Sequence, residues 1–362
     1  MQISDNTTGM EAGISVATDK EGRDFCVVVV KGTFFIEENG ALSLAEEQAP
    51  LIYADEHYGD PGETCIKYEC DFAPFKPRAD VLVNGHACST TGNPVTETTV
   101  GITVGHIRKQ VKVYGDRLWR EGANGIRATA PQPFIKMPLT YDRAFGGSDN
   151  SHPKPKNQGA ELRNPVGTGF FKNADPRNIN NKPLPNLEDP DKLIRSWSDI
   201  PAPAGLGIVG RGWQPRISYA GTYDKTWLDD CFPFLPNDFD EQYFLSAPMD
   251  QQLPSIRGGE TVQCINMTPQ RVLAFTVPEI EFPVAYHFRD RTERQKPVLD
   301  TLLIEPDDRR VLMTWRTRIP LGRKLNALRE IKIGREPAAP RTDSGKPHFK
   351  SIPDFMAWKN ER

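Results

Sequence analysis

The middle of this 362-residue chain is dense in proline, and this feature most limits how the chain can fold. Fifteen of the 32 prolines lie between Pro138 and Pro254. Aromatic residues are interleaved with them, and a flexible linker would lack these because aromatic side chains bury large areas in packed regions. They include Phe145, Phe170, Trp213, Tyr223, Trp227, Phe239 and Phe244. We therefore predict a middle region that is folded and ordered but irregular.

Length and composition limit the class of protein. A chain of this length exceeds the usual size of one domain, so two packed lobes are expected over one large all-β body. The net charge is −3 with both signs mixed throughout, which predicts no binding to nucleic acid or to an anionic membrane. The longest apolar run, Phe25 to Val30, is too short to span a bilayer, and no secretory signal is visible. We expect a cytoplasmic protein whose six cysteines are reduced.

The first 140 residues carry the signals of an antiparallel β lobe. Residues 25–36 are rich in valine and phenylalanine, and a turn and an alternating segment follow them, which predicts a hairpin. A further strand is predicted over residues 111–119. Three Asn-Gly pairs favour an antiparallel meander, and they are Asn39-Gly40, Asn84-Gly85 and Asn124-Gly125.

Strand signals return after residue 255. Residues 261–266 and 271–277 flank a turn, and a second turn joins residues 299–304 to residues 311–319. Apolar and polar residues alternate in the last of these segments, so that Thr314, Arg316 and Arg318 share one face. This alternation predicts a strand with one face in water.

These signals predict a mainly β protein, with antiparallel sheets in two β-rich lobes braced by the long ordered loop region. Both a sandwich and an open barrel fit short alternating strands. A short helix is predicted over Asn237 to Leu245, with Asn237 as its cap and with Phe239 and Tyr243 on one face. The predicted divisions are residues 1–140 for the N-terminal lobe, 141–255 for the loop region, 256–335 for strands that complete the second lobe, and 336–362 for an exposed tail.

Two patterns that resemble cofactor sites lie in the wrong context. Residues 205–210 read Gly-x-Gly-x-x-Gly, but no strand precedes them and no helix follows, so no helix N-terminus is available for a pyrophosphate. Cys65, Cys70, His86 and Cys88 could supply ligands, but no second pair has structural zinc spacing. We predict no cofactor and no metal site.

A cluster of carboxylates offers the best case for an enzyme, because a glycosidase needs two acids that face each other across a sugar. The same residue types also hold irregular loops together by accepting backbone N–H groups. Arg143, Arg163 and Arg216 of the same region could pair with these acids. We therefore expect these acids to brace the loops and not to catalyse a reaction. The sequence also has no Gly-x-Ser-x-Gly elbow of a serine hydrolase, and we predict that the protein is not an enzyme. The acids are Asp224, Asp229, Asp230, Asp238, Asp240, Glu241 and Asp250.

The strings of the middle region and of the N-terminal lobe resemble a bacterial domain-of-unknown-function family that is encoded in type VI secretion clusters. The resemblance covers roughly Met10 to Ile280 in unbroken order. It implies a cytoplasmic effector adaptor and chaperone. Such a protein keeps a toxic effector soluble and delivers it to the VgrG spike or its PAAR tip, and the effector is encoded by a nearby gene. Some relatives continue into pentapeptide repeats, and this chain does not. The strings include DFAPFKPRADVLVNGHA from Asp71, YDRAFGG from Tyr141, NPVGTGF from Asn164, AGTYDKTW from Ala220, LPNDFD from Leu235 and APMDQQ from Ala247.

We therefore expect a non-enzymatic adaptor that covers apolar surface of the effector. The alternatives are a carbohydrate-active enzyme, a lipocalin-like small-molecule binder and a structural piece of the secretion particle. An adaptor should show a large apolar patch or groove, whereas an enzyme should show a deep pocket with paired acids of perturbed pKa. The candidates for partner binding or loop bracing are Arg143, Phe145, Asn164, Phe170, Trp213, Arg216, Tyr223, Asp224, Trp227, Asp238 and Phe239.

Overall fold

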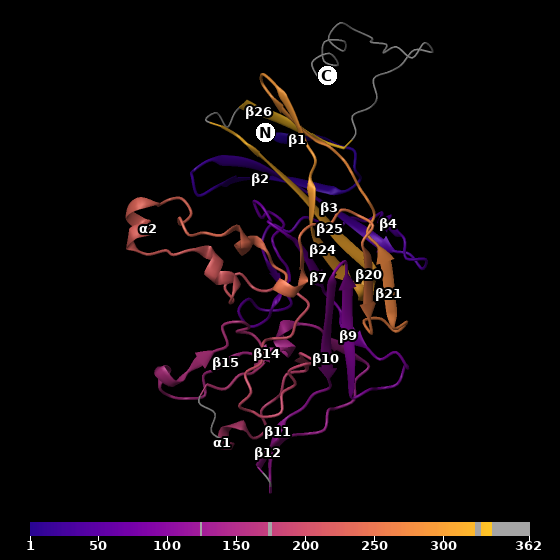
Figure 1. The fold of residues 1–362 in the computed structure, drawn as a ribbon, viewed down its shortest axis with the longest axis vertical. Helices are drawn as coiled ribbons and strands as arrows, with labels where there is room; N and C mark the ends of the chain where they lie inside the picture. Colours follow the sequence, from indigo (N-terminus) through magenta and orange to yellow (C-terminus); the bar gives the residue numbers. More distant parts are fainter. Residues whose placement is uncertain (124, 173–175, 323–326, 335–362) are drawn as a thin grey trace.

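Three sheets contain most of the longer strands in the computed structural model, which describes residues 1–123, 125–172, 176–322 and 327–334 (Figure 1). The largest sheet has the strand order β19-β7-β24-β25-β3-β2, with β4 beside β3. Its strands are β2 (Glu11–Thr18), β3 (Asp24–Ile36), β4 (Leu42–Leu44), β7 (Ala79–Val83), β19 (Gln252–Leu253), β24 (Val298–Glu305) and β25 (Arg310–Pro320).

The other two large sheets have the orders β18-β10-β9-β20-β21 and β1-β26-β22-β23. The first contains β9 (Glu97–Val104), β10 (Ile107–Tyr114), β18 (Leu187–Glu188), β20 (Thr261–Ile265) and β21 (Val272–Thr276). The second contains β1 (Gln2–Asn6), β22 (Val284–Phe288), β23 (Thr292–Gln295) and β26 (Leu328–Ile333).

Two-stranded ribbons and single helical turns make up the remaining regular structure. The ribbons are β5 (Glu56–His57) with β6 (Ile66–Tyr68), β8 (His86–Cys88) with β13 (Lys136–Pro138), β11 (Trp119–Gly122) with β12 (Gly125–Ala128), β14 (Phe145–Gly146) with β17 (Thr168–Gly169), and β15 (Ser148–Asp149) with β16 (Gly159–Ala160). The α-helices are α1 (Pro176–Ile179) and α2 (Lys225–Asp230), and the 3₁₀ turns are Tyr141–Arg143, Pro155–Asn157, Arg216–Ala220, Glu241–Phe244, Met249–Gln251 and Pro306–Asp308.

The prediction of a mainly β fold with antiparallel sheets is confirmed, and no sheet of the described chain closes into a barrel. Apolar side chains from all three large sheets form one core cluster, among them Val30 of β3, Ile102 of β9 and Tyr286 of β22. Burial of such side chains is the main favourable contribution to folding. Both chain segments 1–140 and 256–335 contribute strands to each large sheet, so the lobes are built from parts that lie far apart in the sequence.

Most of the predicted hairpins are present. β3 pairs with β4 around Gly40, whose φ of 80° is the left-handed value that a glycine adopts without strain. β20 pairs with β21, and β24 pairs with β25, both antiparallel as predicted. β11 pairs with β12 as well, although Asn124 of that turn lies outside the described residues.

The Asn84-Gly85 pair does not form a hairpin, so the meander prediction is wrong at this turn. β7 before it belongs to the seven-stranded sheet, whereas β8 after it pairs with β13. Neither Asn84 nor Gly85 has the positive φ that a tight hairpin turn requires. Instead, the Asn84 side chain donates to the carbonyl of Lys67 at 2.8 Å, so this asparagine holds a neighbouring loop.

The prediction of a wet face on β25 is wrong at Thr314 and Arg316, whereas Arg318 near the end of the strand keeps about a third of its side chain exposed. Thr314 and Arg316 expose only 3% and 6% of their surface. Apolar residues of the covering loops, including Leu51, Ile66 and Ile208, pack on this side of the seven-stranded sheet. β25 lies between β24 and β3, so the second face of a central strand is covered by loop instead of by water.

The helix predicted over residues 237–245 is shorter and begins later. A 3₁₀ turn covers Glu241–Phe244, and its cap is Asp240, whose side chain accepts from the Gln242 N–H at 2.8 Å. Asn237 lies before this turn. The predicted contact between Phe239 and Tyr243 is present, with ring centroids 5.9 Å apart. The predicted tail of residues 336–362 lies outside the described residues.

Candidate functional site

Asn164 joins the strings YDRAFGG and NPVGTGF by hydrogen bonds. This residue is fully buried, and its side-chain amide donates to the carbonyls of Tyr141 and Phe145 at 2.8 and 3.0 Å. Gly167 lies so close to Asn164 that an added Cβ would be 2.3 Å from its Nδ2 atom. Asn164 and Phe145 therefore brace the irregular region, and the Phe170 N–H adds a bond to the carbonyl of Gly146 at 2.9 Å.

Arg216 joins two further segments of the middle region to a loop of the N-terminal segment. Its guanidinium pairs with Glu69 at 2.6 Å and donates to the carbonyls of Val209 and Tyr243, both at 2.8 Å. Both charged side chains of this pair are more than nine-tenths buried. Trp213 packs edge-on against Tyr141 in the same neighbourhood, with centroids 5.5 Å apart. Arg216 therefore braces the loops from inside, and the partly buried Trp213 packs against the core.

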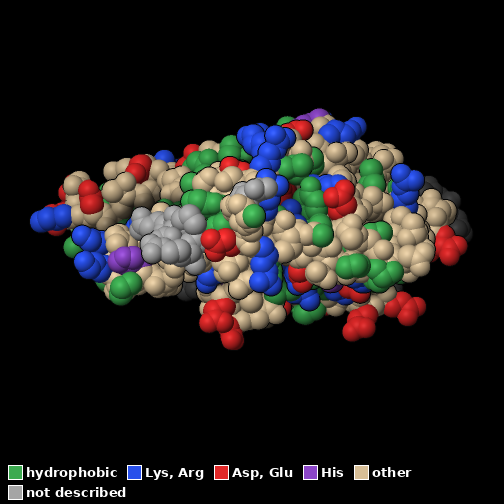
Figure 2. Space-filling view, turned by 90° about the horizontal axis from the view of Figure 1, so that it is seen from below, with side chains coloured by type: hydrophobic (Ala, Val, Ile, Leu, Met, Phe, Trp, Pro, Cys, Tyr) green, Lys and Arg blue, Asp and Glu red, His purple; other side chains and the backbone are tan. Residues whose placement is uncertain are grey.

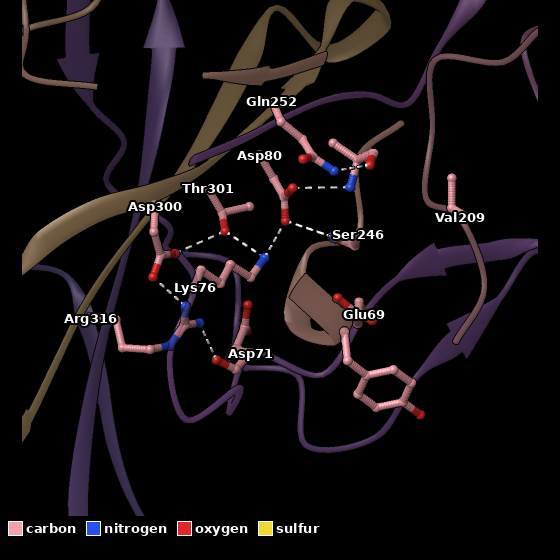
Figure 3. A network of polar contacts seen from close by, with 12 residues as sticks. Glu69, Asp71, Lys76, Asp80, Val209, Ser246, Gln252, Asp300, Thr301 and Arg316 are labelled. Carbon is pink, nitrogen blue, oxygen red and sulfur yellow. Dashed lines mark hydrogen bonds and ion pairs between the residues drawn. The ribbon is translucent and has the colours of Figure 1, made fainter. Parts of the chain in front are cut away.

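A buried polar network attaches the covering loops to the seven-stranded sheet, and Figure 3 shows it at close range. Arg316 of β25 pairs with Asp300 and donates to the carbonyl of Asp71 at 2.6 Å. Lys76 reaches Asp80 of β7 at 2.7 Å and Thr301 of β24 at 2.9 Å. Burial raises the pKa of Asp300, while Arg316 and Lys76 act in the opposite direction.

Asp80 also anchors the string APMDQQ. Its carboxylate accepts from the N–H of Ser246 at 2.9 Å and from the N–H of Ala247 at 3.1 Å (Figure 3). The buried Gln251 of this string donates to the carbonyls of Val81 and Leu206 at 2.8 and 2.9 Å. These hydrogen bonds and ion pairs hold the covering loops to the sheet, and we call this braced loop region the platform.

One segment of the middle region projects from this platform. Residues 221–240, which we call the aromatic arm, carry α2 away from the sheets (Figure 1). Asp224 caps α2 by accepting from the Trp227 N–H at 2.9 Å. At the base of the arm, Asp238 accepts from the backbone and the hydroxyl of Thr222 at 3.0 and 2.7 Å. These hydrogen bonds lower the pKa of Asp238.

The aromatic arm exposes apolar side chains. Tyr223, Leu228 and Phe232 are each more than half exposed, and Phe234 is 43% exposed. Trp227 is the centre of this group, because its ring lies edge-on to Tyr223 at 4.8 Å and to Phe232 at 5.7 Å. The indole N–H donates to the carbonyl of Phe234 at 2.9 Å. The arm is therefore an ordered surface with its apolar groups turned outward, which is typical of an interaction site.

A cavity of about 660 Å³ lies between the base of the arm and the turn that joins β2 to β3. The Phe234 ring lies against Gly22 of that turn, where an added Cβ would be 2.9 Å from the ring. The guanidinium of Arg318 lies over the ring of Phe25 and pairs with Glu241 at 3.2 Å. The lining residues are Ala17, Thr18, Asp19, Lys20, Glu21, Arg23, Phe25, Pro74, Pro77, Leu235, Asn237, Asp238, Phe239, Asp240, Glu241, Phe244 and Arg318.

Most acids of the predicted cluster are bonded to other groups of the protein. Asp224, Asp238 and Asp240 accept backbone N–H groups of the arm and of the 3₁₀ turn after it, as described above. Asp229 pairs with Lys225 at 2.5 Å, and Asp250 pairs with Lys109 at 2.8 Å. These contacts agree with the bracing interpretation.

The predicted pairing of three arginines with that cluster is wrong. Arg143 lies 3.3 Å from Asp116 and donates to Asn186, in a partly exposed position. Arg163 pairs with Glu161 at 2.6 Å, and Arg216 pairs with Glu69. Each partner lies outside residues 224–250.

The residues considered for a cofactor have other partners. Gly205 and Gly210 pack under the rings of Tyr141 and Trp213, with no helix after them. The Cys65 thiol lies 3.3 Å from Asp142, and burial raises the pKa of this thiol to about 12. His86 contacts Asp307 at 2.7 Å. In the described part of the chain, no group of three or more His, Cys, Asp and Glu side chains is placed to hold a metal ion.

The comparisons with known proteins identify a family. A family model described as "Uncharacterized protein conserved in bacteria (DUF2169)" matches residues 21–316. The chain belongs to this family. No curated protein and no solved structure matches the chain. The matched range contains the aromatic arm, the buried network and most of the cavity lining, so these features lie within the family's domain.

The residues predicted from the aromatic strings cover only part of the arm's surface. Tyr223, Asp224, Trp227, Asp238 and Phe239 were among the candidates and lie together in the structure. Leu228, Phe232 and Phe234 were missed. The signal that could have found the last two is Phe-Pro-Phe at residues 232–234, which places two large apolar groups beside a proline directly after a short helix.

Proposed function

We propose that this protein is a non-enzymatic adaptor and chaperone that binds a type VI secretion effector and helps to load it onto the PAAR/VgrG spike. The observation that carries the proposal is the aromatic arm. Its exposed Tyr223, Leu228 and Phe232 form an apolar surface on a braced base, and such patches are uncommon on proteins without a partner. The resemblance to the family of type VI secretion clusters supports the identity of the partner.

The charge distribution is compatible with a protein partner. On the face that Figure 2 shows, basic and acidic side chains are interspersed, and neither sign forms a continuous field. Among the described residues, no helix combines the length and the apolar content needed to cross a bilayer. Binding through exposed aromatic groups needs neither a continuous field of one charge nor a membrane-spanning helix.

The test is co-expression of this chain with the effector encoded beside its gene. We expect the effector to be soluble with the wild-type chain and to aggregate with the double variant Leu228→Asp/Phe232→Asp. Both positions are exposed, and the introduced carboxylates oppose an apolar contact. Ile200→Asp is the matched control, since Ile200 is an equally exposed apolar residue outside the arm. An effector that is equally soluble and equally secreted without this chain would refute the proposal.

The second candidate is a carbohydrate-active enzyme or a small-molecule binder, and the cavity favours it. A volume of about 660 Å³ is within the range of ligand pockets, and Phe25, Phe239 and Phe244 line it together with acids. A catalytic acid needs a raised pKa, whereas hydrogen bonds lower the pKa of Asp238. Hydrolysis of an oligosaccharide that is abolished by Asp238→Asn or Asp240→Asn would favour this candidate over the adaptor.

A further inference from the structure

The strand β2 ends the seven-stranded sheet, and among the described residues its outer edge has no paired strand. It pairs with β3 over eight consecutive residue pairs without a register shift, from Glu11 with Lys31 to Thr18 with Asp24. In the part of the chain that the structure describes, no backbone hydrogen bond joins residues 11–18 to any other segment. An unpaired edge of this length can receive another strand.

The hydrogen bonds at the β2–β3 turn show which groups face outward. The Leu321 N–H donates to the carbonyl of Asp24 at 2.9 Å, so Asp24 faces β25 and the next residue, Phe25, faces β2. Because antiparallel pairing alternates, the residues opposite Phe25, Val27, Val29 and Lys31 bond to β3. The outward N–H and C=O groups therefore belong to the intervening residues Ala12, Ile14, Val16 and Thr18.

The sheet edges differ in how well they are guarded. Proteins protect edges with charges, prolines, short strands or covering loops. β18 and β19 have two residues each, β23 reads Thr-Glu-Arg-Gln, and the turn at Gly40 lies against β21. Residues 12–18 of β2 read Ala-Gly-Ile-Ser-Val-Ala-Thr, without a charge or a proline. β2 therefore has the features of an edge that is kept open for pairing.

This edge leads directly into the cavity at the base of the aromatic arm. Ala17 and Thr18 belong both to β2 and to the cavity lining. The lining carries five acids and three basic residues, so its charge favours a ligand with a basic side chain. The acidic residues are Asp19, Glu21, Asp238, Asp240 and Glu241, and the basic residues are Lys20, Arg23 and Arg318.

We propose that β2 receives an extended, apolar segment of a partner polypeptide as an additional strand, with a basic residue at the end that enters the cavity. The added backbone bonds to the outward groups of Ala12, Ile14, Val16 and Thr18, and the cavity selects the side chains. A second copy of this chain, pairing β2 with β2, would leave the cavity unfilled. The proposal rests on the proposed function in that it supplies the mode by which the adaptor recognises its client.

A proline at position 16 tests the edge without disturbing the β2–β3 ladder. The Val16 N–H points outward, so Val16→Pro removes a donor that β3 does not use, and prolines are tolerated at such edge positions. Val16→Thr is the matched control because it keeps the N–H and the β-branched shape. The probe is a phage-displayed library of random peptides of about ten residues, selected on the wild-type full-length chain.

We expect the selected peptides to be apolar with a basic residue near one end, to bind Val16→Thr like the wild type, and to bind Val16→Pro at least about tenfold more weakly. If Val16→Pro does not fold, amide exchange of the wild-type chain decides: the peptide should slow exchange at Ile14 and Val16. Equal binding to both variants, no selected peptide, or a wild-type dimer that Val16→Pro makes monomeric would overturn the proposal. This assay contains no effector, so its failure is distinct from a failure of the co-expression test.

Discussion

At the scale of single residues, burial decides which ion pair matters for stability. Arg316 and Asp300 are both about 95% buried, whereas Arg143 and Asp116 are 37% and 71% exposed. We predict that Arg316→Ala lowers the free energy of unfolding by about 3 to 5 kcal/mol, because it leaves a buried carboxylate with reduced compensation. Arg143→Ala should cost less than about 1 kcal/mol. Chemical denaturation of both variants measures the difference.

The double variant Arg316→Met/Asp300→Leu serves as the control for this prediction. Replacing both charges by apolar groups should destabilise less than Arg316→Met alone, since no buried charge is left unpaired. Equal losses in Arg316→Ala and Arg143→Ala would show that the network in Figure 3 does not hold the loops to the sheet.

Asp238 gives a prediction for pH. Hydrogen bonds from Thr222 lower its pKa in the folded chain, so the carboxylate form is favoured by folding. The contribution is present above the unfolded pKa of about 3.9 and is lost as the pH falls through the lower folded pKa. We expect exchange of the Thr222 amide, referred to the intrinsic rate at each pH, to lose protection in acid below about pH 4. Asp238→Asn should remove this pH dependence; a dependence that persists would assign it to another group.

At the scale of elements, α2 depends on its cap. With only six residues, the helix has little intrinsic stability, so the bond from the Trp227 N–H to Asp224 is a large part of it. We predict that Asp224→Ala costs the arm about 1 kcal/mol and speeds amide exchange there, while the thermal midpoint of the sheets stays unchanged. Asp224→Ser should restore protection, and an unchanged exchange rate in Asp224→Ala would contradict this role of the cap.

Elements that depend on neighbouring residues could be predicted from the sequence. The β3–β4, β20–β21 and β24–β25 hairpins follow from local strand and turn signals. The Asn84-Gly85 turn could not, because the partner of β7 is β24, more than two hundred residues later. Distant contacts also decide the environment of β25. Alternation in the sequence indicates one apolar and one polar face, but the polar face is buried around Arg316 because this residue contacts Asp71 and Asp300 of other segments.

The candidate site was predictable to a similar extent. Aromatic strings marked both segments, yet Trp213 packs against the core cluster whereas Trp227 packs against Tyr223 and Phe232 of the arm, and these neighbours are a property of the assembled fold. The cavity joins Phe25 to Phe239, which no local pattern connects.

At the scale of the whole molecule, the order of strands predicts how the chain responds to truncation. β24 and β25 lie in the middle of the seven-stranded sheet, between β7 and β3 from the N-terminal segment. We predict that residues 1–255 alone do not fold, because the fragment exposes both broken edges of its largest sheet. Circular dichroism and solubility of this fragment are the measurements, with the full-length chain as control. A soluble fragment with native-like strand content would show that the N-terminal segment is an independent domain.

The position of β25 also has a consequence for synthesis on the ribosome. About 270 residues separate the end of β3 from the start of its neighbour β25. At common elongation rates this distance corresponds to roughly 15 to 55 seconds of synthesis. During this time the valine-rich β3 can pair with β2, but its longer partner strand β25 has not yet been made. We therefore expect the nascent chain to expose an apolar, aggregation-prone strand edge until β25 has been synthesised.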